Sequence, residues 1–176
     1  MRRFVVLGLA ASLAACASRH AAPGVSRPAS GYVSCVPYAR AVSGIMLGGD
    51  ARDWWGAAAG RYARDSRPAP GSVLAFPPHG AMRGGHLSVV MRVEDARRIR
   101  VAHANWASGR DKGQVAVDQL VVDVSPRNDW TLVRVWYPPI GALGTTVWPA
   151  RGFIHPQQPV AATEVAARVS AAPASL

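Results

Sequence analysis

The strongest constraint on the fold is a change of sequence pattern about two fifths of the way along the chain. Residues 35–47 and 51–59 have helical composition, with glycines as stops. Valine-rich runs then follow one another, separated by Gly, Pro, Asp and Asn; they are residues 72–76, 86–93, 98–104, 114–122 and 131–136. Helices that precede adjacent strands predict an α+β fold in which N-terminal helices pack on an antiparallel β-sheet.

The segments that flank this pattern predict the domain organisation. Residues 1–16 are expected to be a signal peptide, because a short positive start precedes an apolar run below the ~20 residues that span a bilayer. Residues 17–30 have the Ala, Ser and Pro composition of a flexible tether. Residues 31–155 are expected to form one domain. Residues 156–176 are expected to be an Ala/Pro-rich disordered tail, in which 162–172 has too little apolar surface to pack firmly as a helix.

The end of the apolar run bears on localisation. Leu13-Ala14-Ala15-Cys16 resembles a bacterial lipobox, which implies that Cys16 is diacylated and becomes the new N-terminus. With Ala17 after the cysteine, we expect an exported periplasmic protein that is held on the outer membrane by this lipid anchor. Ala15-Cys16-Ala17 also fits ordinary signal peptidase, so a soluble periplasmic or secreted protein is the alternative.

The chain is basic, with a formal net charge of +10 at pH 7. This charge suits a partner that carries carboxylates or phosphates, such as peptidoglycan or lipid head groups, and nucleic acid is not expected for an exported chain. Arginine-rich usage can also follow from genome composition, so the charge does not identify the partner by itself.

Cys35 is the second of only two cysteines. If Cys16 is acylated, Cys35 has no partner for an intramolecular disulfide, and it is either a buried small hydrophobe or a functional thiol. Cys35 opens the first predicted helix, where unpaired N–H groups and the helix dipole favour an anion and should lower the thiol pKa.

A cysteine nucleophile needs a base and a group that orients the base. His86 follows Gly84-Gly85 at the start of one predicted strand, and Asn105 ends the next strand. If the two strands are antiparallel neighbours, Asn105 comes within reach of His86. We therefore predict Cys35 as nucleophile, His86 as general base and acid, and Asn105 as orienting residue.

In order and spacing these motifs resemble the CHAP domain, the cysteine, histidine-dependent amidohydrolase/peptidase family of the papain-like NlpC/P60 clan. The resemblance covers roughly residues 31–136. It rests on Cys35-Val36-Pro37-Tyr38-Ala39, Gly49-Asp50-Ala51, Trp54-Trp55, Pro70-Gly71-Ser72-Val73-Leu74-Ala75-Phe76, Gly85-His86-Leu87-Ser88-Val89-Val90 and Ala104-Asn105-Trp106. It implies a papain-like fold, no cofactor, and cleavage of amide bonds in peptidoglycan by an N-acetylmuramoyl-L-alanine amidase or a stem-peptide endopeptidase.

The chain departs from the family pattern at two positions. Many members have Glu two residues before the Asn, where this chain has His103, so we assign orientation to Asn105 and place His103 in or behind the cleft. Ser34 stands where members often have Gln, which leaves the backbone N–H of Cys35 as the predicted oxyanion donor. Two further residues, Tyr32 and Trp106, are candidates for the substrate cleft.

The residues leave three alternatives open. Cys35, His86 and His103 are ligand types that zinc accepts, but no C-x-x-C or H-x-x-x-H spacing supports a metal. The departures also fit a non-catalytic peptidoglycan-binding or scaffold lipoprotein that keeps the CHAP-like fold. A third alternative is an amidase acting on a different peptide or small amide. The scissile bond, the oligomeric state and any activator protein are not determined by the sequence.

Overall fold

The computed structural model describes residues 24–26 and 31–172. The predicted signal peptide, Cys16 and most of the predicted tether lie outside the described residues. The helices are α1 (Cys35–Ser43), α2 (Trp54–Ala57) and α3 (Ala162–Ala171), with short 3-10 helices η1 (Ala51–Asp53), η2 (Gly109–Asp111) and η3 (Pro138–Ile140). The strands are β1 (Gly24–Ser26), β2 (Arg64–Asp65), β3 (Val73–Phe76), β4 (His86–Asp95), β5 (Arg98–Ala104), β6 (Val115–Asp123), β7 (Leu132–Tyr137), β8 (Ala142–Leu143), β9 (Trp148–Pro149) and β10 (Gly152–Ile154).

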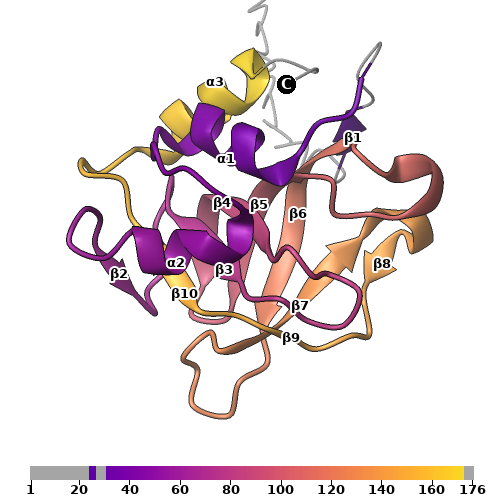
Figure 1. Ribbon diagram of the computed structural model, residues 1–176. Coiled ribbons are helices and arrows are strands. Elements are labelled where there is room, and N and C mark those ends of the chain that lie inside the picture. Colours follow the sequence, from indigo (N-terminus) through magenta and orange to yellow (C-terminus); the bar gives the residue numbers. More distant parts are fainter. Residues whose placement is uncertain (1–23, 27–30, 173–176) are drawn as a thin grey trace, which may run out of the picture.

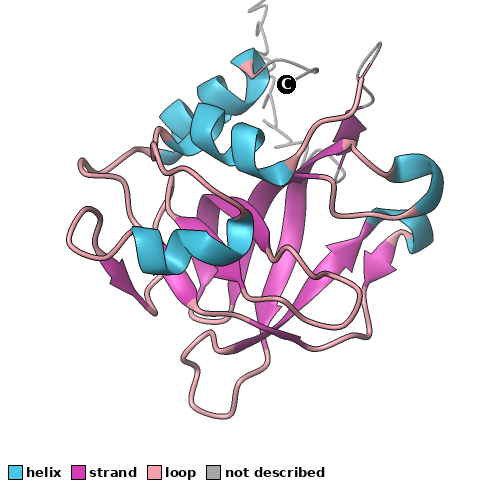
Figure 2. Cartoon of the chain, in the orientation of Figure 1, coloured by secondary structure: helices cyan, strands magenta, loops and turns pink. Residues whose placement is uncertain are grey.

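The strands form one antiparallel sheet in the order β2-β10-β3-β4-β5-β6-β7-β8, with β1 on β6 and β9 on β7. Helix α1 packs on β4 and β5, and α3 lies beside α1 (Figure 1). Figure 2 shows α1, α2 and α3 gathered on one side of the strands. The α+β class with helices on an antiparallel sheet is therefore confirmed, and each predicted valine-rich run is a strand.

The central strands bury both of their faces. Leu87 and Val89 of β4 belong to the core beneath α1, whereas Val90 belongs to a second core on the opposite face together with Phe76 and Phe153. This arrangement follows from the alternation of side chains along a strand. It also places the start of β4, where His86 stands, between the helical layer and the second core.

The first helix ends earlier than the sequence suggested. Gly44 adopts a left-handed conformation with φ of 75° and its N–H bonds to Arg40 O at 2.9 Å, so α1 stops at Ser43 and not at Gly48-Gly49. Glycine is the residue that most readily adopts this terminating conformation. The predicted second helix is present as η1 followed directly by α2.

The C-terminal segment differs from the predicted disordered tail, because residues 162–171 form α3. Val165 of this helix is fully buried in the core beneath α1. Arg168 donates to the carbonyl oxygens of Val42 and Ser43, at 3.4 and 3.2 Å, and pairs with Glu164 at 2.7 Å. Helix α3 is only weakly apolar in sequence. It is held against α1 by the buried Val165 and by Arg168, whose cation binds the unpaired carbonyl oxygens at the end of α1.

Part of the predicted tether also takes regular structure. Gly24–Ser26 pairs with residues 115–117 of β6, a stretch that β7 does not reach because β7 pairs with residues 121–123. In the described part of the chain, no helix is long and apolar enough to cross a membrane.

Candidate active site

Cys35 is the first residue of α1 and is 8% exposed. Burial raises the pKa of its thiol above the ordinary value, while hydrogen bonds from the backbone N–H groups of Leu87, Cys35 and Val36 and from the Ser34 side chain oppose this shift. The predicted lowering of the thiol pKa by the helix start is thus outweighed by desolvation, which disfavours the thiolate. The thiol is protonated at neutral pH and is surrounded by donors that suit an anion.

His86 is the first residue of β4 and is paired with Phe76 of β3. The preceding Gly85 has φ of 70°, and a Cβ there would lie 2.6 Å from the carbonyl oxygen of Phe76 and 2.9 Å from the backbone nitrogen of Arg52. Glycine is therefore required for the close turn that delivers His86 to the sheet. Burial lowers the pKa of His86 to about 3, so its ring is neutral at neutral pH.

His103 lies on β5 and is fully buried. Its Nδ1 lies 3.3 Å from Nε2 of His86 and 2.8 Å from the hydroxyl oxygen of Ser88. The β4–β5 register, in which Val89 pairs with Ala102, explains this contact because its continuation sets Ser88 opposite His103. Burial and the nearby His86 hold the pKa of His103 well below its ordinary value.

Among the described residues, Asn105 forms no hydrogen bond with His86, so its orienting role stays a prediction that these contacts do not support. Asn105 has φ of 60° and follows directly after β5, which ends at Ala104. Its amide nitrogen donates to the hydroxyl of Tyr32, and its oxygen accepts the N–H of Gly113 at 3.0 Å. Among the described residues, the ring nitrogen within hydrogen-bonding distance of His86 belongs to His103.

Asn105 instead joins two segments beside the thiol. Tyr32 covers Gly113 so closely that a Cβ on the glycine would lie 2.5 Å from the tyrosine ring. The N–H of Val33 donates to Gly113 O at 2.9 Å. These contacts hold the segment before Cys35 against the loop after β5. The Tyr32 hydroxyl, predicted as a cleft group, accepts the hydrogen bond from Asn105.

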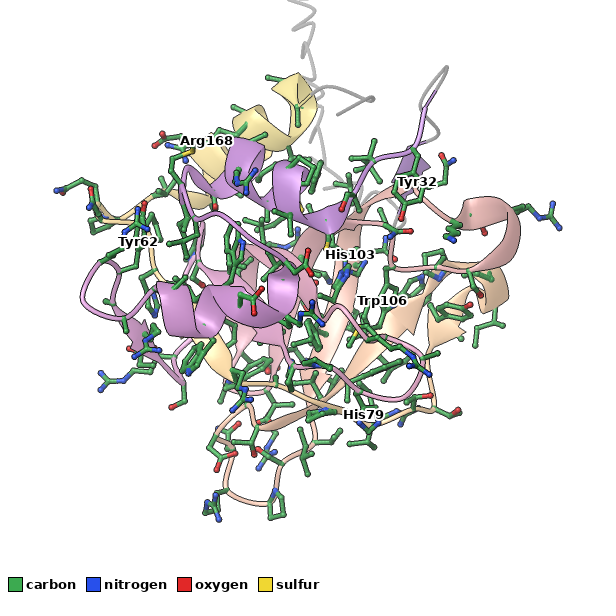
Figure 3. All side chains as sticks on the ribbon, in the orientation of Figure 1. Tyr32, Tyr62, His79, His103, Trp106 and Arg168 are labelled. Carbon is green, nitrogen blue, oxygen red and sulfur yellow. The ribbon has the colours of Figure 1, made fainter. Side chains whose placement is uncertain are left out.

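Trp106, predicted to lie in the substrate cleft, covers both histidine rings. Its ring centroid lies 4.9 Å from that of His86 and 5.4 Å from that of His103, on which it stacks at 19°. The ring centroid of Trp148 lies 5.1 Å from that of Trp106 and 5.6 Å from that of His79. Figure 3 shows His103, Trp106 and His79 following one another down the centre of the molecule.

Cys35 and His86 line one cavity of about 1030 Å³, together with Asn105 and Trp106. In the part of the chain that the structure describes, no hydrogen bond joins the thiol to the His86 ring, although Leu87 N–H, from the residue after His86, contacts the thiol. The cavity is also lined by Ser34, Val36, Asp50, Arg83, Lys112, Val135, Tyr137, Ile140 and Trp148, among others.

The charges on the cavity wall favour an anionic ligand. Asp50 is paired with Arg52 at 3.0 Å. The side chains of Arg83 and Lys112 take part in no hydrogen bond or ion pair with the described residues, so two cations face the cavity without counter-charge. No group of three or more His, Cys, Asp or Glu side chains in the described residues is arranged to hold a metal ion.

The sequence interpretation missed Ser88 and gave His103 a lesser place than the structure does. The sequence contained a signal for each residue. Ser88 lies two residues after His86 on the same strand, hence on the same face, and it is a polar residue within an apolar run. His103 stands two residues before Asn105 and therefore shares its face of an ideal strand. Only the turn at Asn105 separates them.

A comparison with curated proteins returned no significant match. The family model of the CHAP domain matches residues 27–105, a range that contains Cys35, His86, His103 and Asn105. CHAP domains are typically hydrolases that act on peptidoglycan. The resemblance found in the sequence is thus confirmed over residues 27–105.

Proposed function

We propose that this protein is an exported cysteine hydrolase that cleaves amide bonds in peptidoglycan, as an N-acetylmuramoyl-L-alanine amidase or a stem-peptide endopeptidase. The observation that carries the proposal is the shared cavity of Cys35, at the start of α1, and His86, whose Nε2 contacts the buried His103. The CHAP match supports the same chemistry.

The protonation states set the order of events. The thiol and both imidazoles are uncharged in the free enzyme, because burial raises the pKa of Cys35 and lowers those of His86 and His103. Proton transfer therefore accompanies attack. Nε2 of His86 faces His103, so Nδ1 takes the thiol proton as the sulfur bonds to the amide carbon.

The later steps use the same groups. Backbone N–H groups in the first turn of α1, with that of Cys35 first among them, hold the oxyanion of the tetrahedral intermediate. His86 then returns the proton to the departing amine, the C–N bond breaks, and a thioester remains on Cys35. Water, deprotonated by His86, hydrolyses the thioester and frees the thiol. His103 acts through His86 as a positioning residue, the role that the sequence predicts for Asn105.

The cavity wall indicates the part of the substrate that binds. Stem peptides of peptidoglycan carry free carboxylates, and Arg83 and Lys112 offer two cations without counter-charge beside the thiol. Cations that are free to pair with a carboxylate form charge-assisted hydrogen bonds. Export through the signal peptide and anchoring through Cys16 would bring this site to the cell wall.

The test is a digest of purified peptidoglycan with the mature protein and with Cys35→Ala, followed by mass spectrometry of the soluble fragments. We expect fragments from the first protein and none from the second. Free stem peptides identify an amidase, whereas shortened or uncrosslinked peptides identify an endopeptidase. Fragments that persist with Cys35→Ala would refute the role of the thiol.

The raised thiol pKa and the lack of a direct bond between the thiol and the His86 ring favour one second candidate, a non-catalytic peptidoglycan-binding protein. In that case neither protein releases fragments, and both sediment with peptidoglycan to the same extent. A partner that opens the site would give a third pattern, in which fragments appear only after addition of an envelope extract and still require Cys35.

A further inference from the structure

His103 presents a single nitrogen to two polar neighbours, and this arrangement constrains where its proton lies. His86 Nε2 and the Ser88 hydroxyl oxygen both lie within hydrogen-bonding distance of His103 Nδ1, at 3.3 and 2.8 Å. Ser88 and His103 are fully buried, so water does not compete for these contacts. A neutral imidazole has one N–H and one lone pair, so Nδ1 either accepts or donates.

The two tautomers of His103 have opposite consequences for His86. If His103 Nδ1 carries the proton, His86 Nε2 must accept, and the proton of His86 then lies on Nδ1, where it blocks uptake of the thiol proton. If His103 Nδ1 carries the lone pair, His86 Nε2–H donates and Nδ1 of His86 is free to act as base. The proposed mechanism works only with the second tautomer.

Nothing at the far end of the His103 ring decides between the tautomers. Its Nε2 is buried and has no hydrogen-bond partner among the described residues. Trp106 stacks on the ring at 19° and restrains its orientation without offering a hydrogen bond in the ring plane. The choice therefore rests on the groups around Nδ1, of which Ser88 is the closer.

We propose that Ser88 is a positioning residue whose hydroxyl donates a hydrogen bond to the lone pair of His103 Nδ1, which accepts the Nε2–H of His86 as well in a bifurcated arrangement. Ser88 thereby holds His103 as the Nε2–H tautomer and keeps His86 in the base-competent tautomer. This proposal rests on the proposed cysteine hydrolase. The proposed series of side-chain contacts runs from Ser88 through His103 to His86, which acts on Cys35. All three groups behind the thiol lie on the adjacent strands β4 and β5, whose pairing fixes their spacing.

The test is ¹H–¹⁵N NMR of the histidine side chains in the whole mature protein, since protonated and unprotonated ring nitrogens resonate far apart. In the wild type we expect an unprotonated Nδ1 in both His103 and His86. Ser88→Ala should give a mixture of tautomers at His103 and lower kcat/KM about three- to tenfold, the worth of one hydrogen bond. Ser88→Thr keeps a hydroxyl on the strand, so both the single His103 tautomer and the wild-type kcat/KM should be restored.

Ser72→Ala is the matched control, because Ser72 is also fully buried and its hydroxyl donates to Ala69 O at 2.6 Å. It should leave the histidine spectra as in the wild type. A wild-type spectrum with a protonated His103 Nδ1 overturns the proposal. This result does not depend on whether any variant folds. An unchanged spectrum in Ser88→Ala also overturns it. A wild type that cleaves no peptidoglycan, with or without the envelope extract, refutes the proposed function, and the tautomers still decide this inference.

Discussion

Replacement of His103 by leucine tests which residue orients the catalytic imidazole. His103→Leu removes both ring nitrogens but keeps a side chain of similar volume beneath Trp106, so folding should survive. The change leaves His86 Nε2 without its partner at 3.3 Å in a fully buried setting. An unsatisfied buried polar group costs about 1–3 kcal/mol, and if this contact is what holds the imidazole in its reactive orientation, the same energy lost from the transition state lowers kcat about 5- to 150-fold.

The comparison variant is Asn105→Gly, which deletes the amide and suits the positive φ of 60° at that position. Because Asn105 contacts Tyr32 and Gly113 and not His86, this variant should change KM more than kcat. Initial rates of muropeptide release measure both constants, and urea unfolding confirms that each variant folds. A His103→Leu variant with less than about a twofold loss, or a larger kcat loss in Asn105→Gly, would refute the assignment.

Three further predictions concern the thiol, the turn and the cavity wall. Because its pKa is raised, Cys35 should react with iodoacetamide slowly at neutral pH and faster as the pH rises above 9.0, the ordinary value; a rate already at its plateau at pH 7 would contradict this. Gly85→Ala should cost about 1–3 kcal/mol or more in urea unfolding, since it places a Cβ 2.6 Å from Phe76 O at positive φ; an unchanged midpoint would contradict the tight turn. Lys112→Gln should raise KM for peptides with free carboxylates more than for amidated ones, whereas Arg110→Gln, on the same loop but outside the cavity, should not; equal effects would exclude a carboxylate contact.

The fold class could be predicted from the sequence because it depends on local pattern. The valine-rich runs from residue 72 to residue 136 are strands for reasons of side-chain alternation and turn chemistry, and they are adjacent in the chain and in the sheet. The short strands β8 to β10 have no comparable apolar run, and pairing with longer strands stabilises them. Helix α3 likewise gains its stability from burial of Val165 against α1.

The proposed nucleophile and base could also be selected from the sequence. Cys35 at a helix start and His86 after a double glycine at a strand start are local features, and the order of the motifs indicated the resemblance to the CHAP domain. These features depend on residue type and spacing, which a sequence records directly. The structure places both residues on the same cavity.

Only the tertiary structure decided which side chain lies within hydrogen-bonding distance of the His86 ring. Asn105 and His103 are two residues apart, and an ideal strand would present both on one face, but the positive φ of Asn105 turns only His103 toward His86. The protonation states of Cys35, His86 and His103 were likewise beyond the sequence, because desolvation depends on the atoms packed around each group. Residue type sets which chemistry is available, and backbone turns and burial set which atoms carry it out.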